Sequence, residues 1–359
     1  MLLRKLLSVY RRFQFCVFRR QRNGVFSLGR LCAVAPFNVE TNKGDIVHPC
    51  VRYIPEGFEG HTWWMVYTPY YGADAKMENP ILCFAESNDS VPPEKWQIYC
   101  EIQAGYNSGY NSDPTLLFYD GQLYVFWREN ETERVVQHGL FRATFGCRVE
   151  NQHVIERFGT VLETNDSERD PETCPTLLYN EVDGTFKAYS MDLKFHSKWI
   201  KGLPKNIYFF FSYLSLVSDL LGIWSQQKSY GVAVWHSDKI DKSFDYMKTA
   251  KFIKCNKLYR PWHMDLFVYE NVLYAIVQTN QCNADLCLAK CVGNDVFEFF
   301  TKPLITNDSI GKVGIYKPTA GVIGGLFYIY YTAQDVNDRK LNKMYLSTMP
   351  FKELLDKIS

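Results

Sequence analysis

Apolar and polar positions along the chain repeat in one pattern that recurs five times. Each copy opens at or near an X-Pro step, runs through a short β-rich stretch, turns, and enters a second strand rich in Tyr, Trp and Phe. Asp-Gly and Gly-Gly pairs between such runs are typical of hairpins, because these residues accept positive φ. The predicted strand pairs are 51–54 with 63–67, 115–119 with 123–127, 176–179 with 186–189, 264–269 with 273–277, and 319–323 with 327–331.

A third strand-like run follows each hairpin. Repeats of about sixty residues with three or four antiparallel strands are typical of propeller blades. We therefore predict an all-β, five-bladed β-propeller over residues 45–350, with a β-sandwich of accidental periodicity as the alternative. The predicted third strands are 81–85, 135–141, 230–235, 284–290 and 343–348.

The third repeat is interrupted by an apolar insertion at 193–229. Lysines lead into the run 207–224, which is too short and too polar to predict a membrane span. We interpret it as a helical insertion that lies in a membrane interface. A flap packed on the propeller or on a second subunit fits its composition equally well.

The N-terminal segment 1–22 is basic and amphipathic. Arginines interrupt its apolar residues every few positions, which argues against a secretory signal peptide. Contact with an anionic membrane surface and packing along the domain both fit this pattern. We assign residues 1–44 to an N-terminal arm and lead-in, and residues 351–359 to a C-terminal tail.

Charge and cysteine content limit the classes of function. The 40 Lys and Arg residues balance 39 Asp and Glu residues, which argues against an electrostatic nucleic-acid binder. Eleven cysteines are scattered through strand-like runs, which favours a reducing, cytoplasmic compartment. The segments 1–22 and 207–224 add the hypothesis that the protein contacts the inner membrane peripherally. We expect no metal site at Cys282, Cys287 and Cys291. We also expect no cofactor, and no group of residues in the sequence supports a structural cation in the channel.

Polar and aromatic residues flank the X-Pro steps, where the innermost strand of each blade begins. We expect the residue before each proline to be extended, which would aim the side chains consistently into a central funnel. The candidates at these positions are His48, Asp113, Asp170, Glu172, Trp262, His263, Asp265, Tyr316 and Lys317.

The fivefold pattern, over roughly residues 45–350, resembles the superfamily of arabinanases, levansucrases and invertases, which comprises glycoside hydrolase families 43, 32, 68 and 62 and the related mannoside phosphorylases. The stretch 169–175, Arg-Asp-Pro-Glu-Thr-Cys-Pro, resembles the Arg-Asp-Pro and Glu-Cys-Pro elements of the invertase-like members. The segment from His48-Pro49 to Glu78-Asn79-Pro80 also resembles propeller proteins associated with bacterial surface-polysaccharide loci.

The resemblance implies two carboxyl groups placed across a glycosidic bond. By position, Asp113 would be the orienting carboxylate and Glu172 the general acid. Blade one departs from the family, because His48 stands where an aspartate is expected. A neutral imidazole can act as a general base. Glu78, Glu129 and the pair His263 and Asp265, whose i, i+2 spacing puts them on one strand face, are replacement candidates.

Binding roles are predicted for the remaining residues of the ring. Trp262 suits a sugar-stacking floor, and the expected substrate-binding set is Glu78, Trp127, Arg128, Glu129, Asp170, Trp262, Tyr316 and Lys317. Structural roles compete with these. His48 could bond a neighbouring blade, Glu172 could cap a turn, Arg128 and Glu129 could form an inter-blade ion pair, and His263 with Asp265 could be structural.

Two hypotheses follow from the sequence. The first is a glycoside-active enzyme, a hydrolase, phosphorylase or transglycosylase, that acts on surface-polysaccharide or related glycans. The second is a non-catalytic sugar-binding or assembly propeller of polysaccharide biosynthesis. The His48 substitution favours the second, and the retained ring of charged residues favours the first.

Overall fold

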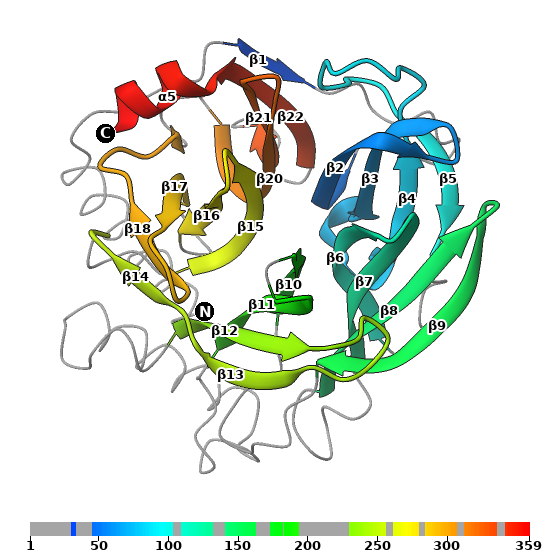
Figure 1. The fold of residues 1–359 in the computed structure, drawn as a ribbon. Helices are drawn as coiled ribbons and strands as arrows, with labels where there is room; N and C mark the ends of the chain where they lie inside the picture. The colour runs from blue at the N-terminus through cyan, green and yellow to red at the C-terminus, as the bar shows by residue number, and fades with distance from the viewer. Residues whose placement is uncertain are drawn as a thin grey trace, which may run out of the picture.

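The computed structural model describes residues 30–33, 45–102, 109–131, 141–162, 173–181, 183–193, 230–255, 261–279, 284–306, 312–335 and 342–359. Within these ranges the strands form five sheets arranged around a central axis (Figure 1). The first long strand of each blade, β2, β6, β10, β15 or β20, lies nearest this axis. The predicted all-β, five-bladed propeller is thereby confirmed.

Blades one to three each have four antiparallel strands in chain order. Blade one consists of β2 (Ile46–Phe58), β3 (His61–Pro69), β4 (Ile81–Phe84) and β5 (Gln97–Glu101), with the short 3-10 helices η1 (Tyr71–Ala73) and η2 (Ala75–Met77) between β3 and β4. Blade two consists of β6 (Gly109–Tyr119), β7 (Gln122–Glu131), β8 (Phe141–Glu150) and β9 (His153–Leu162). Blade three consists of β10 (Thr173–Asn180), β11 (Thr185–Leu193), β12 (Tyr230–Ser237) and β13 (Asp245–Thr249).

Blade four has additional outer strands, and blade five takes its fourth strand from the N-terminal part of the chain. Blade four consists of β14 (Lys251–Ile253), β15 (Pro261–Tyr269), β16 (Val272–Thr279), β17 (Asp285–Cys291), β18 (Val296–Phe299) and β19 (Ile305–Thr306). Blade five consists of β20 (Lys312–Ile323), β21 (Leu326–Asp335), β22 (Asn342–Pro350) and the N-terminal strand β1 (Arg30–Ala33). Because β1 pairs antiparallel with β22, residues from both parts of the chain build blade five and close the ring.

Apolar side chains fill each of the five interfaces between neighbouring blades. The interface of blades one and two, for example, packs Ile54 and Trp64 against Leu116 and Trp127. The C-terminal helix α5 (Phe351–Ile358) belongs to the interface of blades four and five, where Phe351, Leu354 and Ile358 are fully buried. The predicted C-terminal tail is thus part of the hydrophobic core.

The central turn residues of two predicted hairpins have left-handed backbone, which confirms these turns. Asp120 and Gly121 have φ of 50° and 70°, and Gly324 and Gly325 have φ of 56° and 81°. Positive φ at both central residues is what a two-residue hairpin with right-handed strand twist requires.

A β-bulge occurs at the start of the innermost strand in every blade. The register of strand pairing shifts between Val47 and Cys50 in blade one and between Ser112 and Thr115 in blade two, and the other blades shift at the corresponding points. The extended backbone expected before proline is wrong at three of these steps, because His48, Asp113 and Lys317 have φ of 57°, 55° and 30°. A bulge leaves the extra residue outside the ladder, so its backbone can turn the side chain toward the axis.

Other strand predictions need correction. The third strand of blade two is β8 (Phe141–Glu150), which begins where the predicted run 135–141 ends. Residues 132–140 lie outside the described part of the chain, as do segment 1–22 and, apart from Leu193 at the end of β11, the helical insertion predicted at 193–229. Among the described residues, no helix is both long and apolar enough to cross a membrane.

Candidate active site

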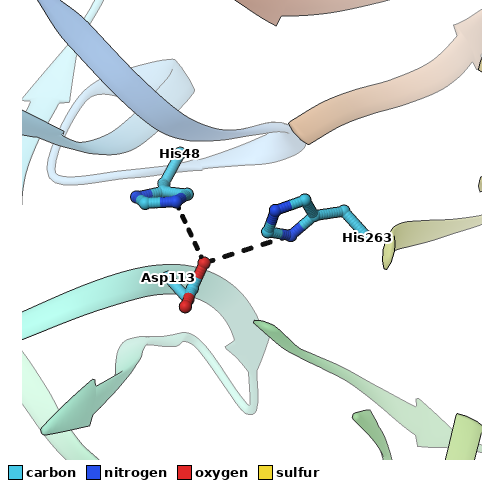
Figure 2. Close-up of side chains that lie close together, drawn as sticks. All are labelled: His48, Asp113 and His263. Atoms are coloured by element: carbon cyan, nitrogen blue, oxygen red, sulfur yellow. Dashed lines mark ion pairs between the residues drawn. The ribbon is translucent and has the colours of Figure 1, made fainter. Parts of the chain in front are cut away.

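Three buried side chains from three blades converge near the propeller axis. His48 from β2, Asp113 from β6 and His263 from β15 point toward one another (Figure 2). One carboxylate oxygen, Asp113 Oδ1, lies 3.2 Å from His48 Nε2 and 4.0 Å from His263 Nδ1. The exposed fractions of the three residues are 5%, 1% and 0%. Residues up to 215 positions apart in the chain, from His48 to His263, therefore share one small volume.

Asp113 is held on its other side by a cation. Arg128 Nη2 lies 2.8 Å from Asp113 Oδ2, and Arg128 also donates to Ser112 Oγ through Nε and Nη2, at 3.1 and 2.7 Å. Burial by itself raises the pKa of Asp113, but the electrostatic interactions with Arg128, His48 and Lys317 outweigh it and hold this pKa well below its usual range. Asp113 is therefore ionised.

Glu78 lies on the far side of the His48 ring. His48 Nδ1 is 2.9 Å from Thr68 Oγ1 and 3.2 Å from Glu78 Oε2. Since Thr68 Oγ1 donates to the carbonyl of Val47, it is placed to accept a hydrogen bond from His48 Nδ1. Burial raises the pKa of Glu78, and the contact with His48 offsets this only in part. The imidazole thus connects two carboxyl groups, one on each ring nitrogen.

His263 packs among aromatic rings. Its ring centroid lies 4.4 Å from that of Tyr316 in an edge-to-face arrangement, and the Tyr316 ring lies 5.2 Å from the His48 ring. Trp262 Nε1 is 3.5 Å from the Tyr316 hydroxyl. Burial holds the pKa of His263 well below its usual value, so this imidazole is neutral. Trp262 and Tyr316 are only partly buried and form the more accessible part of the cluster.

Lys317 adds a second buried cation to this region. Only 3% of the residue is exposed, its Nζ donates to the carbonyl of Pro114 at 3.0 Å, and its backbone N–H donates to Gln278 Oε1 at 2.7 Å. Lys317 thereby links blade five to the Asp113-Pro114 bulge of blade two and to blade four.

Two of the predicted site residues have their contacts elsewhere. Both carboxylate oxygens of Asp265 bind Arg52, at 2.6 and 2.8 Å, and Thr319 Oγ1 also donates to Asp265 at 2.6 Å. Trp127 is fully buried in the core between blades one and two. These contacts place Asp265 and Trp127 in the framework of the fold, although both were predicted site residues.

Arg128 and Glu129 do not form the ion pair that was one structural alternative. They are adjacent in β7, so their side chains leave the strand on opposite faces, and Arg128 reaches Asp113 whereas Glu129 binds Arg157 and accepts from Trp127 Nε1. Glu129 therefore lies away from the convergence of His48, Asp113 and His263. Asp170 and Glu172 lie outside the described residues.

Sequence reasoning named Arg128 but missed Thr68 and Thr332, although all three support a bulge from the neighbouring strand. Thr68 is paired with Val47 and Arg128 with Ser112, just before the bulges of blades one and two, and Thr332 is paired with Tyr316 in blade five. Each is a polar residue directly after an apolar run, as in Trp127-Arg128 and Tyr331-Thr332. This change from apolar to polar residues at the end of the second strand of each blade is the sequence feature that could have identified them.

The cluster contains a set of groups that metal ions use as ligands. Among the described residues, His48, Asp113 and His263 each offer one ligand atom, and these three atoms lie within 4.8 Å of one another. Two imidazole nitrogens and one carboxylate oxygen suit a divalent transition metal better than Ca²⁺ or Mg²⁺, which prefer oxygen ligands.

Comparison with solved structures identifies proteins of the same architecture. An N-acetylgalactosamine deacetylase from F. plautii, solved with blood group B trisaccharide, matches with a TM-score of 0.62 and 14% identity over 91% of this chain and 96% of that one. The fold is a five-bladed propeller of the type found in glycoside hydrolases. A family 117 glycoside hydrolase from Zobellia galactanivorans has a TM-score of 0.58 at 11% identity, over 90% of this chain and 91% of that chain. The GH43_1 enzyme from Xanthomonas citri has a TM-score of 0.56 at 9% identity, over 89% of each chain.

Sequence comparisons add no closer relationship. No family model matches this propeller chain. No curated protein matches it either. At identities of 9 to 14%, the structural matches establish the propeller fold and leave the chemistry to the residues at its centre.

Proposed function

We propose that the protein is a carbohydrate-active hydrolase whose catalytic centre is the cluster around His48 and Asp113. The observation that carries the proposal is the position of His48 between two buried carboxyl groups, Asp113 at 3.2 Å from Nε2 and Glu78 at 3.2 Å from Nδ1. Charged and polar groups that converge from several blades are typical of a functional site, because stabilising the fold does not require them to meet at one point. The fold shared with sugar-acting enzymes supports the choice of substrate class.

Cleavage of a glycosidic bond requires an acid that protonates the leaving oxygen and a carboxylate that attacks or activates water. Asp113, ion-paired with Arg128, takes the part of the carboxylate. Glu78 takes the part of the acid, and His48 relays a proton between the two carboxyl groups. Trp262 and Tyr316 are the partly exposed aromatic residues next to the cluster, and they suit contact with a sugar ring.

A second candidate reaction is hydrolysis of an N-acyl group on the sugar. The observation that favours it is that two imidazoles and one carboxylate face a common point, whereas Glu78 and Asp113 are separated by the His48 ring. A compared structure is named as an N-acetylgalactosamine deacetylase. Such a reaction needs an activated water and a proton donor, but not a pair of carboxyl groups across the scissile bond.

Surface polysaccharides and related glycans are the proposed substrates, and the cytoplasmic face of the inner membrane is the proposed location. Both proposals come from the basic segment 1–22, the apolar run 207–224 and the resemblance to proteins of polysaccharide loci. Deleting residues 1–22 should release the protein from vesicles that contain anionic lipid. Equal binding of the full and truncated chains to such vesicles would contradict the role of this segment.

The test is a screen against capsular and lipopolysaccharide-type oligosaccharides with Asp113→Asn and Glu78→Gln beside the wild type. We expect kcat/KM to fall at least about 100-fold in either variant, because each removes a proton-transfer group. New reducing ends identify glycosidic cleavage, and free acetate with a new amine identifies deacylation. The matched controls Asp120→Asn and Glu56→Gln change exposed carboxylates of the same blades and should keep wild-type rates.

The outcomes of this screen are distinct. Sugar binding without turnover in the wild type and in both variants would replace the enzyme by a sugar-recognition propeller. Turnover that survives both Asp113→Asn and Glu78→Gln would also overturn the proposal, because the reaction would then occur elsewhere.

A further inference from the structure

We propose that His48, Asp113 and His263 bind one divalent transition-metal ion of the zinc class. Each residue comes from a different blade and each is almost fully buried. The three ligand atoms lie within 4.8 Å of one another, and Figure 2 shows both imidazoles directed at the same carboxylate oxygen. The inference rests on the second candidate reaction, hydrolysis of an N-acyl group, and deepens it, since the metal would activate the water. The binding of the metal itself does not depend on any substrate.

The distances fit a small coordination sphere. In a tetrahedral zinc site with metal–ligand bonds of about 2.0 to 2.1 Å, neighbouring ligand atoms are roughly 3.3 Å apart. His48 Nε2 and Asp113 Oδ1 are 3.2 Å apart, and His263 Nδ1 and Asp113 Oδ1 are 4.0 Å apart. The first separation already fits, and the second requires a shift of roughly 0.7 Å. The His48 and His263 ligand atoms, which lie within 4.8 Å of each other, would also have to move closer, and rotation of the side chains would supply these shifts.

The surroundings of His48 match those of metal-bound histidines. A metal-ligating histidine almost always donates its second ring N–H to a carboxylate, a carbonyl or another oxygen, which fixes the tautomer and the ring plane. His48 Nδ1 has Thr68 Oγ1 at 2.9 Å and Glu78 Oε2 at 3.2 Å. With Nδ1 protonated, the lone pair of Nε2 faces the point that Asp113 and His263 share.

Asp113 is oriented in a similar way. Arg128 binds its Oδ2 at 2.8 Å and Ser112 Oγ lies 3.4 Å from the same oxygen, so Oδ1 is the oxygen turned toward the two imidazoles. The left-handed backbone of His48 and Asp113, with φ of 57° and 55°, fixes both side chains in this direction. Strained backbone of this kind is characteristic of sites where geometry has a function.

A bound metal ion would take the place of a proton on His48, which contacts both Asp113 and Glu78. Without a metal ion, His48 can donate hydrogen bonds to both Asp113 and Glu78 only when both of its ring nitrogens carry hydrogen. A metal ion at Nε2 replaces that proton, and three protein ligands leave a coordination position open for water, as in catalytic zinc sites.

The experiment measures metal binding directly, on the purified full-length chain after chelation. Zn²⁺ binding is followed by calorimetry and Co²⁺ binding by visible absorption, with Ca²⁺ and Mg²⁺ as comparison ions. We expect one Zn²⁺ per chain, a Co²⁺ spectrum typical of low coordination number, and at least 100-fold weaker binding in Asp113→Asn and His263→Gln. Thr68→Val, which changes a partner of His48 and no ligand, should weaken binding about 10-fold or more.

Controls separate this site from adventitious binding. His153→Gln changes an exposed histidine on β9 and should bind Zn²⁺ as the wild type does. Thermal unfolding of each chelated variant shows whether it is folded. The proposal is overturned if the wild type binds no Zn²⁺ at micromolar concentrations, or if Asp113→Asn and His263→Gln bind as the wild type does.

Failure of this inference is distinguishable from failure of the proposed function. Full hydrolysis of a glycan by chelated protein that binds no Zn²⁺ would refute the metal and leave the hydrolase. Stoichiometric Zn²⁺ at these residues in a protein that turns over no glycan would refute the hydrolase and leave the metal site.

Discussion

Arg52 on β2 and Asp265 on β15 form a bidentate ion pair, with N–O distances of 2.6 and 2.8 Å, that connects blades one and four. These blades are not neighbours in the ring, so the pair bridges the first strand of blade five, whose Thr319 also donates to Asp265. The pair, together with Thr319, holds three innermost strands together.

Substitution Asp265→Asn should therefore destabilise the fold and leave the site chemistry intact. Removing one partner of a buried ion pair costs about 3 to 5 kcal/mol, because the other charge stays buried without compensation. Urea unfolding should show this loss in free energy of unfolding, with kcat near the wild-type value at temperatures where the variant is folded. A loss of turnover without a loss of stability would instead place Asp265 in the catalytic centre.

Ring closure by β1 gives a second prediction. Replacing both Leu31 and Cys32 by proline removes backbone donors at two successive positions of β1, so whichever N–H faces β22 is lost. We expect the free energy of unfolding to fall by on the order of 2 kcal/mol, and the exposed edge of β22 to favour self-association. The matched double alanine variant keeps the ladder. Equal stability of the proline and alanine variants, measured by urea unfolding, would show that β1 does not close the ring.

Asp295 makes stability depend on acid pH. It joins blade four to blade three through Lys248 at 2.8 Å, Tyr189 at 2.5 Å and Lys187 at 3.6 Å. Burial by itself raises the pKa of Asp295, but the contacts with Lys248, Tyr189 and Lys187 lower it below its usual value.

Because the folded-state pKa is depressed, the stabilisation is present above the unfolded pKa of about 4 and is lost as pH falls through the folded value. Asp295→Asn should cost about 2 to 3 kcal/mol at neutral pH, and the difference from wild type should shrink below about pH 4. Unfolding by urea at several pH values measures this, with the exposed Asp238→Asn as control. A difference that stays constant down to pH 2 would contradict the assignment.

Trp262 should affect binding of a glycan more than its turnover. It is partly buried beside Tyr316, with its indole nitrogen 3.5 Å from that hydroxyl and its ring next to that of His263. Trp262→Ala should raise KM about 3- to 10-fold, which corresponds to 0.5 to 1.5 kcal/mol of aromatic contact, with kcat changed much less. Trp262→Phe should recover part of the loss. A fall in kcat at unchanged KM would assign Trp262 to the chemical step.

The number of blades, the hairpins and the convergence of His48, Asp113 and His263 follow from local patterns. Alternation with period two, turn residues such as Asp120-Gly121, and a repeated X-Pro step are encoded within a few residues of each strand. Once five such units form a ring, the starts of their first strands must lie near one axis. That much was available from the sequence by itself.

Only the tertiary structure decided which polar groups are partners. Asp265 binds Arg52, 213 residues away, Arg128 binds Asp113 and not the adjacent Glu129, and Glu78 reaches His48 from the loop after η2. Left-handed backbone at His48 and Asp113 likewise depends on the bulge that the sheet imposes. Side-chain contacts across a ring are set by blade packing and by depth along the axis, and neither is contained in the local pattern of a strand.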